Sequence, residues 1–161
     1  MQSPTNTTNT SQVIIAGREN GISNVLFRNA VGMKLGLNNA DMECLDLLFF
    51  RQVSSPAELA HYTSLTSGAT TAMLDRLEKK GYVARQPHPH DRRSVQVVLV
   101  PEAMATIKPL FASVRAAQAD LLATYSPEQL NTLTDYFERS AALWEQERAK
   151  LSVTKNRSSR G

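Results

Sequence analysis

The amino-acid sequence predicts a mainly α-helical protein with one small β-hairpin. Residues 55–62 and 67–80 are two helical segments separated by a short turn, which is the spacing of a helix-turn-helix. Two segments with strand character, 82–86 and 94–100, follow them. A helix-turn-helix followed by a β-hairpin is a winged helix, and apolar residues at helical spacing on both sides predict flanking N- and C-terminal helices.

Length and composition are those of a globular protein. The chain has 161 residues, 42% hydrophobic and 20% charged, so a core can form without metal or disulfide support. No apolar run is long enough to span a bilayer. Residues 1–12 lack the basic and apolar regions of a signal peptide, so we expect no membrane and a cytoplasmic location. The net charge of +3 permits a nucleic-acid partner without requiring one.

The chain is expected to divide into a winged helix with an extension and a tail on each side. Residues 1–10 are predicted to be a disordered tail, and residues 11–37 an N-terminal dimerisation helix that glycines weaken. Residues 38–100 form the winged helix. Residues 101–151 form C-terminal dimerisation helices, which Pro109 should kink or interrupt. Residues 152–161 are a basic, flexible tail.

Local signals mark where helices begin and end. A helix is expected from Ala40 to Gln52. Its apolar stripe is Met42, Leu45, Leu48 and Phe49. Ser-Pro-Ala-Glu at 55–58 and Ser-Pro-Glu-Gln at 126–129 are capping boxes, in which the serine and the residue three positions later satisfy backbone donors at the helix start. Gly81 should end the helix over 67–80.

The hairpin is predicted from alternating polarity and from prolines. Val95, Val97 and Leu99 share one face of the second strand. The seven residues from Pro87 to Arg93 lie between the strands, and the prolines at 87 and 89 favour an extended loop. The winged helix therefore has a wing whose end is charged.

The helix over 67–80 is the candidate recognition helix. One face should be core: Thr70, Met73, Leu74 and Leu77. Helix N-terminal N–H groups suit phosphate, hydroxyl groups suit base edges, and small methyl groups suit the thymine methyl. The candidate DNA-contacting residues at the helix start, on its opposite face and in the wing are Thr66, Ser67, Gly68, Ala69, Thr71, Ala72, Arg76, Lys79, Arg92 and Arg93. The alternative for residues 66–68 is a helix cap alone.

Catalytic and metal-binding patterns are not found in the sequence. There is no Gly-rich phosphate loop, H-E-x-x-H or G-x-S-x-G, so we expect no enzyme. His88 and His90 have no third ligand nearby in the sequence, so we expect no metal and no other cofactor. Cys44 lies among apolar residues and is predicted to pack in the core rather than to sense oxidants.

Five short motifs follow one another along the chain. They are Leu-Gly-Leu-Asn at 35–38, Asp-Met-Glu-Cys-Leu at 41–45, Glu-Leu-Ala at 58–60, Asp-Arg-Leu-Glu-Lys-Lys-Gly-Tyr-Val at 75–83 and Asp-Arg-Arg-Ser-Val at 91–95. In this order and at these spacings the sequence resembles the MarR family of winged-helix transcriptional regulators. The resemblance is close over residues 30–100 and looser in the outer helices.

The resemblance implies a homodimer that binds a pseudopalindromic double-stranded DNA operator, usually as a repressor. A small aromatic or anionic ligand often releases such proteins from DNA. The resemblance also implies that Asp91 pairs with Arg93 and orients the wing, which leaves Arg92 for the minor groove. The alternative is that all three are solvated loop charges.

The last helix has an apolar stripe that a lone winged helix cannot cover, so we expect a homodimer. At near-heptad spacing, its residues are Leu130, Leu133, Phe137, Ala141 and Trp144. A second hypothesis is a winged helix that serves as a protein-interaction module without specific DNA binding. The adjacent Arg92 and Arg93 argue against it, because such a loop is poorly suited to an apolar interface.

Overall fold

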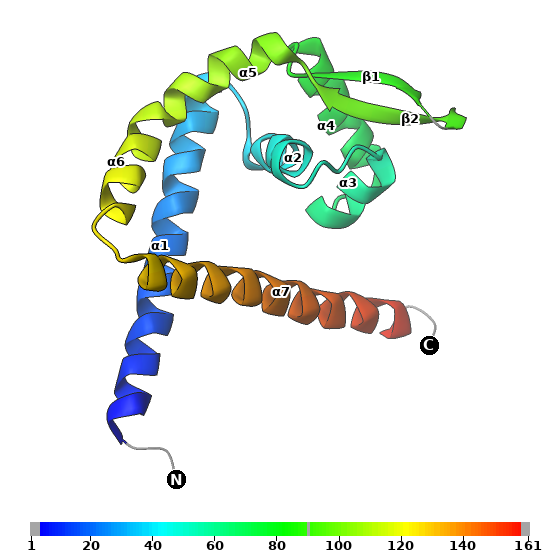
Figure 1. The fold of residues 1–161 in the computed structure, drawn as a ribbon. Coiled ribbons are helices and arrows are strands. Elements are labelled where there is room, and N and C mark those ends of the chain that lie inside the picture. Colours follow the sequence, from blue (N-terminus) through cyan, green and yellow to red (C-terminus); the bar gives the residue numbers. More distant parts are fainter. Residues whose placement is uncertain (1–3, 90, 159–161) are drawn as a thin grey trace. The chain divides into compact units, whose positions relative to one another are not determined.

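The computed structural model describes the backbone of residues 4–89 and 91–158, and the side chains of residues 9–89 and 93–151. The chain forms two compact units, of which the first ends at Leu110 and the second begins at Phe111. The predicted fold class is confirmed: a mainly helical chain has one antiparallel two-stranded hairpin after a helix-turn-helix (Figure 1). No helix among the described residues is long and apolar enough to cross a membrane.

The first unit contains five α-helices and the hairpin. In chain order they are α1 (Pro4–Leu35), α2 (Asn39–Phe50), α3 (Pro56–Thr63), α4 (Ser67–Lys79), β1 (Val83–His88), β2 (Asp91–Leu99) and α5 (Pro101–Ile107). The predicted helix-turn-helix is the pair α3 and α4.

Helix α1 is longer than expected and largely exposed. It begins at Pro4, so residues 4–10, which we predicted to be a disordered tail, are helical. Extending a helix costs much less than nucleating one, and this polar segment extends a helix that has already formed. Val31 is buried, but seven other large apolar side chains of α1 are 52–76% exposed: Val13, Ile14, Ile15, Ile22, Val25, Leu26 and Met33.

The turn between α1 and α2 is well defined. Gly36 has φ +67°, a left-handed conformation that glycine adopts at low cost and that commonly ends a helix. A complete capping box then opens α2: the Asn38 side chain accepts from the Asp41 amide, and the Asp41 carboxylate accepts from the Asn38 amide. Arg28 of α1 forms an ion pair with Asp46 of α2. The C-terminal end of α1 is thereby fastened to α2.

The core lies where α2, α3, α4 and the hairpin meet. The predicted core face of α4 is confirmed, because Thr70, Met73, Leu74 and Leu77 are at most 2% exposed. Met42, Leu45 and Leu48 of α2 are buried as predicted. Phe49 is not buried. It is 45% exposed and packs edge-on against the exposed Phe50 in the last turn of the helix.

The wing differs from the predicted long loop. The strands continue through Pro87 and from Asp91, and the register pairs Pro87 with Val95 and His88 with Asp91 across an irregularity. Proline is tolerated at a sheet edge or bulge because its missing N–H need not join the ladder, so β1 continues through Pro87 and ends at His88, directly before Pro89. Of the predicted apolar face, Val97 is buried while Val95 is 46% exposed.

The helical segment after the wing is interrupted near Pro109, as we predicted. Helix α5 ends at Ile107, a 3-10 turn η1 spans Lys108–Phe111, and α6 runs over Ala112–Leu122. Helix α7 (Pro127–Ser158) makes up most of the second unit. The capping box at its start is present, because the Ser126 amide donates to the Gln129 side chain (2.8 Å) and the Gln129 amide to the Ser126 hydroxyl (3.3 Å). Residues 152–158, predicted to be a flexible tail, continue the helix.

Cys44 is a core residue, and its thiol should be unreactive in the native protein. The side chain has no exposed surface, and burial, followed by the nearby Asp41 and Glu43 charges, raises its pKa to about 12. At neutral pH the thiolate is the reactive species and is nearly absent here. We expect a thiol reagent such as iodoacetamide to modify Cys44 only after denaturation, as measured by intact mass. Rapid modification of the folded protein would contradict this.

Candidate nucleic-acid interface

The start of α4 is built by its cap. Ser64 ends α3 with φ +57°, and Thr66 is the N-cap of α4. The Thr66 hydroxyl accepts from the Ala69 amide (3.2 Å), and its carbonyl accepts from the Thr70 hydroxyl (3.0 Å). The first amides of a helix have no intrahelical acceptor, so those of Ser67 and Gly68 are directed out of the N-terminal end. Such an end favours an anion.

Six of the ten predicted DNA-contacting residues form one exposed surface on this end, which we call the reading face. All have small side chains and all are exposed: Thr66, Ser67, Gly68, Ala69, Thr71 and Ala72. A Cβ added at Gly68 would meet nothing within 4 Å, so the fold itself does not require glycine there. Small side chains allow a helix to approach the floor of a groove closely.

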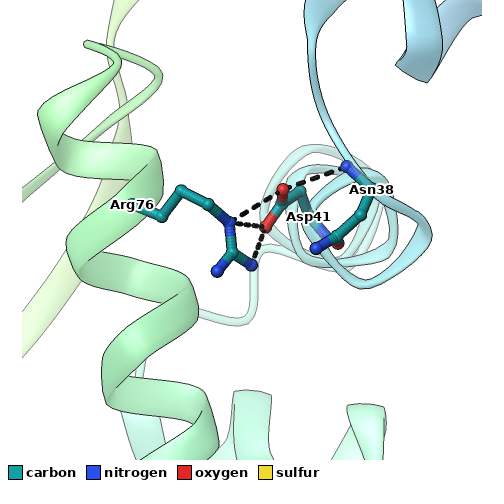
Figure 2. Close-up of polar contacts among 3 residues, drawn as sticks. All are labelled: Asn38, Asp41 and Arg76. Atoms are coloured by element: carbon teal, nitrogen blue, oxygen red, sulfur yellow. Dashed lines mark hydrogen bonds and ion pairs between the residues drawn. The ribbon is translucent and has the colours of Figure 1, made fainter.

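Arg76, another of the predicted DNA-contacting residues, forms an ion pair within the protein. Its guanidinium binds the carboxylate of Asp41 on α2, with Nε 3.1 Å from each oxygen and Nη2 2.6 Å from Oδ1 (Figure 2). Asp41 is 1% exposed, and its hydrogen bonds raise the pKa of Arg76 above its usual value. Sequence reasoning did not single out Asp41. The Asn-x-x-Asp pattern at 38–41 could have identified its capping role.

The side chain of Arg85 on β1 also forms ion pairs within the protein. It pairs with Asp75 (2.7 Å) and Glu78 (2.6 Å) of α4 and donates to the Thr71 carbonyl (3.4 Å). The Glu78 carboxylate also accepts from the Arg85 amide, and this hydrogen bond is the largest cause of the lowered Glu78 pKa. Ion pairs therefore hold α4 from two sides: Arg85 of β1 binds two of its carboxylates, and Asp41 of α2 binds its Arg76.

The remaining predicted contacts are distributed over the end of α4 and the wing. Lys79 is exposed, and so is Arg93. Lys80 places its ammonium nitrogen 3.3 Å from where a Cβ on Gly36 would lie, beside the α1–α2 turn. The side chains of Asp91 and Arg92 lie outside the described residues, as does all of His90. Among the residues that are described, no three His, Cys, Asp or Glu side chains cluster to hold a metal ion.

The fold and the exposed end of α4 define a winged helix-turn-helix protein, and comparisons identify its family. The MarR family profile matches residues 37–95. The chain is 36% identical over 134 residues to the uncharacterized HTH-type transcriptional regulator YcgE of Bacillus subtilis, covering 83% of this chain and 87% of that protein. The chain belongs to the MarR family of helix-turn-helix transcriptional regulators, which are not enzymes.

Solved structures agree on the fold. Apo MarR from E. coli aligns with a TM-score of 0.52 at 28% identity, covering 76% of this chain and 94% of that one. A mutant of MepR from S. aureus, solved bound to an oligodeoxyribonucleotide, aligns with a TM-score of 0.51 at 14% identity, covering 83% of this chain and 96% of that one. The second likeness concerns the fold alone.

Proposed function

We propose that the protein is a cytoplasmic homodimer that binds a pseudopalindromic DNA operator through α4 and represses transcription until a small aromatic or anionic ligand releases it. The observation that supports this most strongly is the reading face, a capped and exposed helix end of small residues. Family membership and the DNA-bound state of MepR also support DNA as the partner. Two reading faces in a dimer would meet half-sites about one helical turn apart, roughly 34–36 Å.

The experiment is a binding titration on DNA upstream of the coding gene. Inverted repeats found there are labelled, and binding of the full-length protein is followed by fluorescence anisotropy against a scrambled duplex. We expect tighter binding to one repeat, and weaker binding when benzoate, as a probe for aromatic anions, is added. Equal, weak binding to all duplexes would favour the protein-interaction module. If benzoate does not change operator binding, ligands of the benzoate type do not release the protein, and that part of the proposal is wrong.

Gly68→Ala is expected to weaken operator binding without harming the fold. The added methyl group has open space in the protein, and alanine is the better helix former by roughly 0.5–1 kcal/mol, so the melting temperature should stay or rise. At a closely approached DNA groove the same methyl group should clash, with a loss on the order of tenfold, or about 1.4 kcal/mol.

The matched control for Gly68 is Ala105→Ser, an equally small enlargement at an exposed position of α5. We expect it to leave both the melting temperature and the affinity unchanged. Undiminished operator affinity in Gly68→Ala would show that DNA does not approach the helix at this residue.

A further inference from the structure

Asp41 makes an unusual set of contacts for a buried carboxylate. It is 1% exposed, and it accepts from the Asn38 amide at the start of α2 (3.1 Å) and from two nitrogens of Arg76 on α4 (Figure 2). No buried side-chain nitrogen or oxygen among the described residues lacks a hydrogen-bond partner. One carboxylate thus joins the first turn of α2 to the recognition helix.

This contact has directional consequences. A guanidinium is planar and its donors form a rigid fork, so a carboxylate that receives two of them fixes both the distance and the orientation. Asp41 cannot move to accommodate a rotated Arg76, because its other contact belongs to the capping box of α2. Arg85 holds Asp75 and Glu78 of the same helix from β1. Rotation of α4 about its axis is therefore restrained from two elements.

We propose that Asp41 is a positioning residue for DNA recognition, which acts through Arg76 to set the rotation of α4 and hence the direction in which the reading face points. The proposal rests on the proposed function and assigns Arg76 to orientation rather than to phosphate. Base-edge contacts require defined geometry, whereas flexible lysines reach phosphates from many geometries. Loss of the pair should therefore reduce the preference for operator over scrambled DNA more than it reduces total affinity.

The test compares Asp41→Asn, Arg76→Gln and the double variant in the full-length protein. Each is titrated with operator and scrambled duplexes at several salt concentrations, below the temperature at which circular dichroism detects unfolding. The double variant replaces the ion pair with two amides and leaves no charge without a partner, so it keeps the test valid if a single variant does not fold. Asp46→Asn is the matched control, because Asp46 is also a paired carboxylate on α2 but is bound to Arg28.

We expect the ratio of operator to scrambled affinity to fall on the order of tenfold in each single variant, and no further in the double variant. The salt slope on operator DNA should not change, and Asp46→Asn should keep the parent's ratio. A phosphate contact by Arg76 would give a different pair of results. Arg76→Gln would make the slope of log K against log salt shallower by about 1.8, from roughly 0.9 for each of two protomers, and Asp41→Asn would keep the parent's ratio of operator to scrambled affinity. That outcome would show that the proposal is wrong. An equal loss of preference in Asp46→Asn would show a general loosening of α2, which also overturns it. A parent without operator preference would instead overturn the proposed function.

Discussion

Removal of residues 127–161 is expected to produce a monomer that no longer binds operator DNA tightly. Residues 127–158 form α7, in which Leu130 and Leu133 are half-buried while Phe137 and Trp144 are 58% and 70% exposed. Exposed aromatic side chains along one stripe favour a partner surface of the same kind. A monomer would bind one half-site, and losing the second linked contact costs about 10²–10⁴ in affinity.

Sedimentation velocity gives the oligomeric state, and fluorescence anisotropy gives the operator affinity. Phe137→Glu and Trp144→Glu, made together, should reproduce the truncation without shortening the chain. Arg139→Gln is the control, because Arg139 and its partner Asp135 are an exposed pair on the same helix, with side chains 81% and 64% exposed. Exposed pairs of this kind contribute little to stability. A full-length chain that sediments as a monomer at micromolar concentration would contradict the dimer.

Arg92→Ala should produce the second large loss, and the loss should depend on the DNA flanks. A guanidinium in the minor groove senses the more negative potential of narrow A·T-rich tracts. We expect a cost on the order of 1–3 kcal/mol for each arm of the dimer, greatest on operators with A·T-rich flanks. The measurement is anisotropy at fixed salt on operators that differ only in their flanks. An equal loss on A·T-rich and G·C-rich flanks would argue against minor-groove recognition.

Asp91→Ala tests the orienting role implied by the family resemblance. Although it removes a negative charge, it should weaken binding because the wing arginines lose their fixed direction. Tighter binding than the parent on both kinds of flank would show that charge alone governs the wing.

Patterns of apolar residues and caps were sufficient to predict the winged helix. The period of Thr70, Met73, Leu74 and Leu77 identified the buried face of α4, since burial requires that spacing. The ends of the helices at 4 and 158 were not predictable, because polar residues permit either a helix or a coil. The wing loop was predicted too long because Pro87, at a sheet edge, does not end its strand.

The exposure of the reading face could also be predicted, but the contacts of the cations further along α4 could not. Arg76 and Lys79 look equivalent in the sequence, three residues apart on one helix. Arg76 faces a carboxylate 35 residues earlier in the chain, and only the packing of α2 against α4 brings the two together. Under the positioning role that we propose for Asp41 and Arg76, a charge count overestimates the cations that are available to phosphate.

The salt dependence of operator binding tests the central claim most directly. The sequence contains six candidate cations around the recognition helix and wing: Arg76, Lys79, Lys80, Arg85, Arg92 and Arg93. If half of the twelve in a dimer met phosphate, log K would fall with log salt at a slope near −5. Arg76 and Arg85 bind carboxylates, and Lys80 lies at the α1–α2 turn. We propose that Lys79 and the wing residues Arg92 and Arg93 supply the phosphate contacts.

We therefore predict a slope on operator DNA that is clearly negative and no steeper than about −5.4, from roughly 0.9 for each of six contacts in a dimer. Operator should bind more tightly than scrambled duplex at each salt concentration. The measurement is a set of anisotropy titrations of the full-length protein between about 50 and 200 mM salt, a range over which phosphate contacts change affinity strongly. A slope near zero with equal affinity for the two duplexes would contradict DNA recognition by this helix and wing.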